Sequence, residues 1–357
     1  MEYEWIKNVA IISNDYTSIK FYDEFNDIIK SNSLSENLLN LTFGRFFNQK
    51  IEPNTLPENL SNLTFGQFFN QKIEPNTLPK NLSNLTFGSR FNQKMKPNTL
   101  PKKLTTLDFT RDYNQKIKPN TLPENLINLN LSSNFNQIIE PNTLPENLKT
   151  LNFGFYFNQK IKPNTLPENL TNLIFGYYFN QIIEPNSLPE NLSNITFEGM
   201  FNQKIKPNTL PEKLTTLKFG YYFNQEIEPN TLPEKLINLT FGYNFNRKIE
   251  PNTLPDNLKN IIFNWIYLEK SVPIKQYIEM VNNIPNYYHV EIFLENNIFD
   301  NNGLKWPIHV FNYRENMWSS NIYNIQGNYT HPIHSDITVL INKNTYQPYS
   351  SAKSALK

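Results

Sequence analysis

The sequence predicts a repeat solenoid, a rod built of stacked and nearly identical coils. Three observations carry this prediction. Aligned against itself, the chain of 357 residues repeats every 22 residues without slippage. Ten coils are complete, and an eleventh starts at Leu254 and fades after Phe263. Twenty of the 25 prolines occupy only two places in the unit, so proline marks fixed turns rather than low complexity. The complete coils begin at Leu34, Leu56, Leu78, Leu100, Leu122, Leu144, Leu166, Leu188, Leu210 and Leu232.

Each coil is predicted to hold one short strand followed by irregular backbone that turns back. The fullest unit, LPENLSNLTFGQFFNQKIEPNT at residues 56–77, defines positions 1 to 22. Within it, Leu63 and Phe65 alternate with polar neighbours, which is typical of a half-buried strand. Pro57 at position 2 and Pro75 at position 20 exclude continuous helix or strand there.

The predicted core is a set of apolar positions that hardly vary. Leucine fills positions 1 and 5, leucine or isoleucine fills position 8, and phenylalanine fills positions 10 and 14 with the exceptions Leu131 and Tyr113. Isoleucine fills position 18 except at Met95. Six apolar side chains cannot offset the conformational entropy lost by ordering 22 residues, so a coil is stable only when stacked. Parallel strands about 4.8 Å apart would make eleven or twelve coils roughly 50–60 Å long.

Asparagine recurs at positions 15 and 21 of every full coil. Its amide offers donors and an acceptor to the backbone of its own turn and of the next coil, which predicts a stacked structural ladder inside the turns. The predicted ladder at position 15 consists of Asn48, Asn70, Asn92, Asn114, Asn136, Asn158, Asn180, Asn202, Asn224 and Asn246.

The repeat resembles known families. Leu126, Leu129, Leu131 and Asn134, in LINLNLSSN, resemble the strand motif of leucine-rich repeats. The closer resemblance, over about residues 34–264, is to the FNIP repeats of social amoebae and of giant viruses of amoebae, through Phe-Asn followed by isoleucine as in FNQKI at 69–73. The resemblance implies a leucine-rich-repeat-like solenoid with a short parallel strand and irregular turns per coil. It also implies a protein-binding role, and it brings no catalytic residues.

Three regions are predicted: an N-terminal cap with a degenerate coil at 1–33, the FNIP repeat solenoid at 34–264, and a small α+β C-terminal domain at 265–357 that caps the array. In the first, residues 19–21 and 25–29 fit the repeat frame. In the last, 274–284 has helical spacing, and 290–296, 306–313 and 336–344 resemble strands.

Composition excludes several classes of function. The chain has no cysteine, which excludes thiol chemistry and cysteine-ligated zinc. The net charge of +1 gives no general attraction to nucleic acid or anionic membranes. Without an apolar run of bilayer length or a signal-like start, a cytoplasmic protein is expected. The HPIHSD stretch at 331–336 fixes no third metal ligand, so neither a metal nor a cofactor is expected.

Positions 12 and 13 vary along the array, unlike the core. Position 12 is polar or basic in the first coils and largely aromatic later. A contact surface can vary in this way, and aromatic side chains give a large contact area. The predicted partner-binding residues are Phe155, Tyr177, Tyr221 and Tyr243. Aromatic stacking that only stiffens the edge is the alternative, and the sequence leaves open whether the position-13 aromatics are buried or exposed.

The sequence therefore predicts a non-catalytic, monomeric scaffold that binds an unidentified protein. The alternative is the substrate-recognition adaptor of a ubiquitin ligase, because some relatives carry an F-box before their repeats. The eleven residues before the degenerate coil are too few for that helical module, which disfavours this alternative. An enzyme housed in 265–357 would require a pocket of converging polar groups.

Overall fold

The structure is a computed structural model that describes residues 6, 8–250, 252–265, 289–294, 309–312 and 317–320. The chain divides into two compact units, Met1–Leu258 and Lys259–Lys357, and each is described by itself. The predicted boundaries at 33/34 and 264/265 stay predictions, while this division falls between Leu258 and Lys259.

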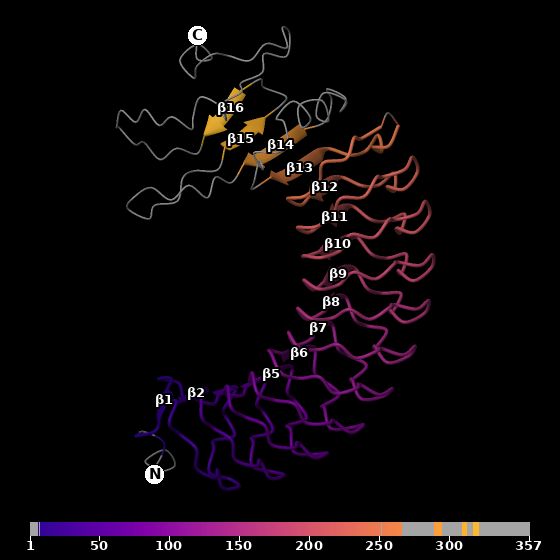
Figure 1. The fold of residues 1–357 in the computed structure, drawn as a ribbon. Helices are drawn as coiled ribbons and strands as arrows, with labels where there is room; N and C mark the ends of the chain where they lie inside the picture. The colour runs from indigo at the N-terminus through magenta and orange to yellow at the C-terminus, as the bar shows by residue number, and fades with distance from the viewer. Residues whose placement is uncertain are drawn as a thin grey trace, which may run out of the picture. The chain divides into compact units, whose positions relative to one another are not determined.

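The first unit is a stack of coils whose strands follow one another in sequence order (Figure 1). From β2 to β12, adjacent strands pair in parallel with their residues offset by 22, as when Leu63 lies opposite both Leu41 and Leu85. The parallel solenoid with one strand per coil is therefore confirmed. Its strands are β2 (Ser18–Phe21), β3 (Asn40–Thr42), β4 (Asn62–Thr64), β5 (Asn84–Phe87), β6 (Thr106–Phe109), β7 (Asn128–Asn130), β8 (Thr150–Asn152), β9 (Asn172–Phe175), β10 (Asn194–Phe197), β11 (Thr216–Lys218) and β12 (Asn238–Phe241).

The N-terminal end of this unit is closed by a hairpin that the sequence did not suggest. β1 (Ala10–Ile12) pairs with β2 in antiparallel fashion, with Ala10 opposite Phe21. Ile19, Phe25 and Ile29 are buried at the positions that the repeat frame assigns to them. Because β1 covers the open edge of β2, the stack does not present an unpaired strand there.

The core is a double column of stacked rings. Within a coil, the rings at positions 10 and 14 stack closely, with Phe65 and Phe69 centroids 3.8 Å apart. Between coils the same positions stack again, with Phe65 5.6 Å from Phe87 and Phe69 6.2 Å from Phe91. The aromatic residues at these positions, together with the leucines at positions 1, 5 and 8, are buried in all ten complete coils.

Glycine at position 11 is required by the close approach of successive coils. A Cβ built on Gly66 would overlap the carbonyl of Gly44, and one built on Gly88 would overlap the carbonyl of Gly66. A glycine at position 11 therefore lets the turn after the strand stack at the strand spacing, and the exceptions at this position are Thr110, Ser132 and Glu198.

The second unit is described only in its strands. β13 (Asn260–Trp265) pairs in parallel with β14 (His289–Leu294). β14 pairs antiparallel with β15 (His309–Asn312), and β15 with β16 (Met317–Ser320). β14 and β15 overlap the strands expected at 290–296 and 306–313, whereas β16 was not expected. The helix expected at 274–284 and the strand expected at 336–344 lie outside the described residues.

Candidate protein-binding edge

Positions 12 and 13 lie on the turn directly after each strand, and the backbone holds them at the spacing of the coils. The Tyr178 amide donates to the Phe155 carbonyl at 2.9 Å, and the Tyr156 amide donates to the Ser133 carbonyl at 2.8 Å. Within the coil, the Phe179 amide donates to the Gly176 carbonyl at 3.1 Å and closes the turn. Side chains at these positions therefore form two adjacent rows along the stack.

In coils 6 to 10 these rows carry aromatic side chains, which we call the aromatic edge. The edge consists of Phe155, Tyr156, Tyr177, Tyr178, Tyr221, Tyr222 and Tyr243. It extends over four coil spacings, or about 19 Å at about 4.8 Å each.

Exposure differs between the two rows. Of the four predicted partner-binding residues, Phe155 is exposed, at 41%, whereas Tyr177, Tyr221 and Tyr243 are half-buried. The position-13 rings are exposed, with Tyr156 at 47%, Tyr178 at 38% and Tyr222 at 37%. The sequence left open whether the position-13 aromatics are buried or exposed, and in coils 6, 7 and 9 they are exposed. These three tyrosines, which are more accessible than those of position 12, were not among the predicted partner-binding residues. Their signal was the same aromatic repetition that picked out position 12.

The rings support one another along and across the rows. Phe155 stacks on Tyr177 with centroids 5.0 Å apart, and Tyr156 stacks on Tyr178 at 5.1 Å. Across the rows, Phe155 meets Tyr156 edge to face at 5.0 Å. Such contacts fix the rings before any partner arrives, which lowers the entropic cost of binding through them.

Gly199 interrupts the aromatic edge at coil 8, and its lack of a side chain leaves room for contact between the rings of coils 6 and 7 and those of coils 9 and 10. In that coil the glycine stands at position 12 rather than 11, and a Cβ on it would lie 2.6 Å from Cγ of Tyr177. The Tyr177 ring therefore rests on the Gly199 backbone. Burial raises the pKa of the Tyr177 phenol, and a side-chain hydrogen bond with Tyr222 raises this pKa further. Tyr177 and Tyr222 thus connect the coil 6–7 rings to the Tyr221–Tyr243 pair, whose centroids are 4.7 Å apart.

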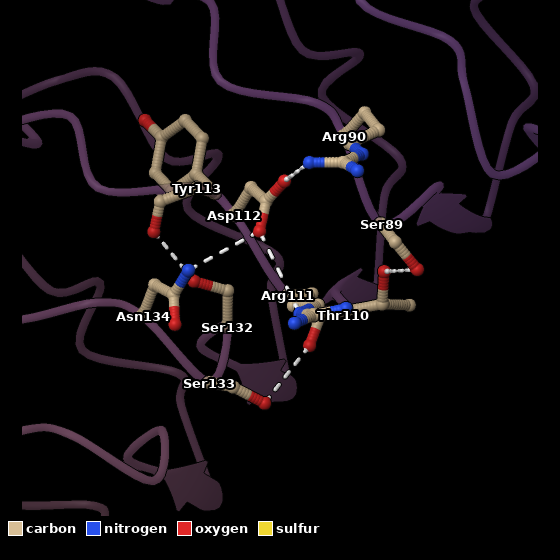
Figure 2. Close-up of polar contacts among 9 residues, drawn as sticks. All are labelled: Ser89, Arg90, Thr110, Arg111, Asp112, Tyr113, Ser132, Ser133 and Asn134. Atoms are coloured by element: carbon tan, nitrogen blue, oxygen red, sulfur yellow. Dashed lines mark hydrogen bonds and ion pairs between the residues drawn. The ribbon is translucent and has the colours of Figure 1, made fainter.

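At the N-terminal end of the same rows, the chemistry is different. Phe46 stacks on Phe68 at 5.3 Å, and the Arg45 guanidinium lies 5.3 Å from the Phe46 centroid as a cation–π contact. Further along, coils 3 to 5 carry a polar cluster (Figure 2). There Asp112 receives a hydrogen bond from Asn134 at 3.1 Å and forms an ion pair with Arg90 at 3.4 Å.

Beneath the polar cluster the repeat deviates in a coordinated way. Ser132 replaces the glycine of position 11, and its hydroxyl donates to the Tyr113 carbonyl at 2.5 Å (Figure 2). Leu131 replaces phenylalanine at position 10 beside it, which interrupts one of the two ring columns. Burial raises the pKa of the Tyr113 phenol. The polar cluster of coils 3 to 5 therefore lies between the Arg45, Phe46 and Phe68 side chains of coils 1 and 2 and the aromatic edge of coils 6 to 10.

The position-15 asparagines are connected by hydrogen bonds from coil to coil. The backbone N–H of each asparagine donates to the side-chain Oδ1 of the asparagine 22 residues earlier, at 2.8–3.1 Å, and the series starts with Asn48 and Asn26. The following glutamine reinforces the contact, as when Gln159 Nε2 donates to Asn136 Oδ1 at 3.0 Å. These side chains position the turn below the aromatic edge.

The asparagines of position 21 serve another purpose. From Asn54 to Asn252 each adopts a left-handed backbone with φ of 61–67°, and all ten are exposed. Asparagine tolerates this conformation better than other side-chain-bearing residues. The expectation that both columns form the ladder is wrong for position 21, because that residue is selected by its backbone conformation.

The described residues contain no group of three or more His, Asp or Glu side chains placed to hold a metal ion. No helix in the described part of the chain is long and apolar enough to cross a membrane. The HPIHSD stretch lies outside the described residues.

Comparison with known proteins relates this geometry to a family. The FNIP Repeat family matches residues 25–68, 69–112, 113–156, 157–200, 201–244 and 223–265. Among solved structures, the chain is similar to CroV588 of the giant virus Cafeteria roenbergensis virus, described as a novel circular LRR protein structure. The two are 40% identical with a TM-score of 0.66, over 81% of this chain and 45% of CroV588, so the chain spans less than half of that protein's length. No curated protein matches.

Proposed function

Because the chain belongs to the FNIP repeat family, we propose that it is a non-catalytic scaffold that binds a protein partner through the aromatic edge. One observation carries the proposal. The constant positions of the repeat build the core and the ladder, whereas the aromatic residues of positions 12 and 13 are confined to particular coils and reach solvent. A position needed only for stacking would carry the same residue in every coil.

The chemistry of the edge fits a protein surface. Positions 12 and 13 carry no charged side chain in coils 6 to 10. Tyrosine offers a large rigid apolar area with a hydroxyl at its tip, which is typical of the centre of protein–protein interfaces. The rings are held in place by stacking, so little side-chain entropy remains to be lost on binding.

The test is capture of partners from the native cell, followed by mass spectrometry, with the wild-type chain and two variants. The edge variant replaces Phe155, Tyr156, Tyr178 and Tyr222 by serine, since these four rings are exposed. The half-buried Tyr177, Tyr221 and Tyr243 are left in place to protect stability. The control variant replaces Ile138 and Ile182 by serine, because both are 46% exposed and lie at position 17, away from the edge.

Both variants should melt close to the wild-type temperature, since exposed substitutions usually change stability by no more than about 0.5 kcal/mol each. The edge variant should lose a partner that the wild type and the control retain, with binding weakened roughly thirtyfold if two rings each contribute about 1 kcal/mol. Equal loss in both variants would mean nonspecific apolar adhesion. Retention of every partner by a folded edge variant would refute the proposal.

A further inference from the structure

A groove of 510 Å³ is lined by residues that precede the strands, whereas the aromatic edge is formed by residues that follow the strands. It crosses coils 3 to 6 and is lined by side chains of positions 4 and 6. Three of the lining residues are asparagines at position 4, and two are lysines, Lys103 and Lys149. Ile127 contributes an apolar surface that is 40% exposed.

The groove lies where the repeat departs from its own pattern. At position 6, a hydroxyl normally donates to the position-6 carbonyl of the preceding coil, as from Ser83 to Ser61 at 3.0 Å and from Thr171 to Lys149 at 3.0 Å. Ile127 and Lys149 lack that hydroxyl in two adjacent coils inside the array, as Leu39, Ile237 and Lys259 do near its ends. At position 4, Lys103 replaces asparagine. Core packing does not require these changes, because positions 4 and 6 point away from the buried rings.

Charge is concentrated at the same coils. Coils 3 and 4, residues 78–121, carry nine lysines and arginines against two aspartates, although the whole chain has a net charge of only +1. Position 3 is lysine in these two coils, at Lys80 and Lys102, and acidic in the others. Glu124 and Glu146 occupy position 3 in the next two coils but are not among the lining residues.

The two lining lysines are placed differently. The Lys103 ammonium donates to Asn81 Oδ1 at 2.7 Å, which holds it at the edge of the groove. Among the described residues, the Lys149 ammonium has no hydrogen-bond or ion-pair partner. The two lysines are two coils apart, or about 9.6 Å along the stack at about 4.8 Å per coil.

We propose that this groove is a second binding site, for an extended acidic segment of a protein. In an extended polyproline II segment, carboxylates three residues apart lie on the same side of the chain and about 9.3 Å apart, which matches the two-coil separation of the lysines along the stack. Asn125 and Asn147 line the same groove, and each donates to a carbonyl of the preceding coil at 2.9 Å. Each side-chain amide keeps a second N–H and the Oδ1 acceptor for a peptide backbone. No aromatic side chain lines the groove, so it offers no surface on which nucleic-acid bases would stack.

The test uses fluorescence anisotropy with a labelled peptide that carries glutamate at every third residue and glycine or serine elsewhere. The same peptide with lysine for glutamate and an oligothymidine of equal charge serve as alternative probes. The variant is Lys103→Gln with Lys149→Gln. Its matched control is Lys213→Gln. Lys213 lies in coil 9, outside the groove, and its ammonium donates to Oδ1 of Asn191 in coil 8 at the same 2.7 Å.

The wild type and Lys213→Gln should bind the glutamate peptide alike, and the double variant should bind it at least about fivefold more weakly. Binding should weaken as salt is added, and an aromatic-edge variant should retain it, which separates this site from the proposed function. Absence of glutamate-peptide binding, equal weakening by Lys213→Gln, or tighter binding of the oligothymidine would each overturn the proposal.

Discussion

Position 22 carries buried hydroxyl groups that differ in whether they have a hydrogen-bond partner. The hydroxyls of Thr77, Thr143 and Thr231, among others in the column, are buried without a hydrogen-bond partner. Ser187 occupies the same position in coil 7, and its hydroxyl donates to the Glu184 carbonyl at 2.6 Å. A buried hydroxyl without a partner costs about 1–3 kcal/mol, whereas a paired one contributes about 0.5–1.5 kcal/mol.

Thr143→Val should therefore raise stability, because valine has nearly the same shape and removes the unpaired hydroxyl. The expected gain is about 1 kcal/mol, measured as a higher midpoint of thermal or urea unfolding. Ser187→Ala is the matched comparison and should lower the midpoint. If Thr143→Val unfolds at a lower midpoint than the wild type, the Thr143 hydroxyl does have a hydrogen-bond partner in the folded protein, which would contradict this prediction.

Asp108 carries a prediction about pH. Burial raises the pKa of its carboxyl, and a hydrogen bond with Asn130 offsets part of the rise. The folded state therefore holds this proton more tightly than the unfolded chain, whose aspartate pKa is about 3.9. The stability that this proton contributes is present in acid and is lost as the pH rises past the folded-state pKa.

Asp108→Asn should accordingly raise the melting temperature at neutral pH, and the gain should shrink towards pH 3, where both states of the wild type are protonated. Asparagine already stands at this position in Asn130 and Asn152, so the substitution fits the strand. Melting curves across this pH range provide the measurement. A gain independent of pH would show that the charge of Asp108 is not the cause.

At the scale of the element, two turns of each coil are fixed by two asparagine columns with different physical roles. In the ladder, Asn136 Oδ1 accepts the Asn158 amide at 2.9 Å and Gln159 Nε2 at 3.0 Å. At the opposite turn, Asn142 has a φ of 62°. The first column is selected for its side-chain acceptor and the second for its backbone.

Substitution separates the two roles. Asn136→Ala should cost about 1–3 kcal/mol, because it leaves the half-buried Asn158 amide without its acceptor. Asn142→Gly should be nearly neutral, whereas Asn142→Ala should cost roughly 1 kcal/mol through backbone strain. Chemical unfolding of the three variants gives the comparison. Equal losses for Asn142→Gly and Asn142→Ala would contradict the role assigned to position 21.

The sequence predicted the elements that depend on repetition along the chain. The strands, their 22-residue register and the buried Phe columns follow from period and alternation, since stacking places equal positions side by side. It did not predict the β1 hairpin, because that segment occurs once. It could not separate the two asparagine columns or the exposure of Tyr178, because φ angles and ring packing depend on neighbouring coils.

The groove at Lys103 and Lys149 was missed for a related reason. Lys103, Ile127 and Lys149 each depart from the repeat by a single substitution, which in isolation indicates only a solvated surface. Their proximity appears once coils 3 to 6 are stacked and positions 4 and 6 form adjacent rows. The aromatic edge was easier to find, because its residues depart from the polar pattern in the same direction over several coils.

At the scale of the molecule, the array separates stability from recognition. Each coil contacts only its neighbours through rings, ladder amides and glycine turns that scarcely change along the chain. Surface rows can therefore change from coil to coil without altering the stack. This arrangement allows one chain to carry an aromatic edge over coils 6 to 10 and a basic groove over coils 3 to 6.

Site-specific photo-cross-linking can report directly whether the aromatic edge touches the partner. A benzophenone amino acid is placed at Tyr178 on the edge, or at Ile138 on another exposed row, and the native cell is irradiated. If the edge binds the partner, irradiation should yield a cross-linked protein from position 178 that is absent from position 138. Equal cross-linking from both positions, or cross-linking from position 138 alone, would contradict binding through the edge.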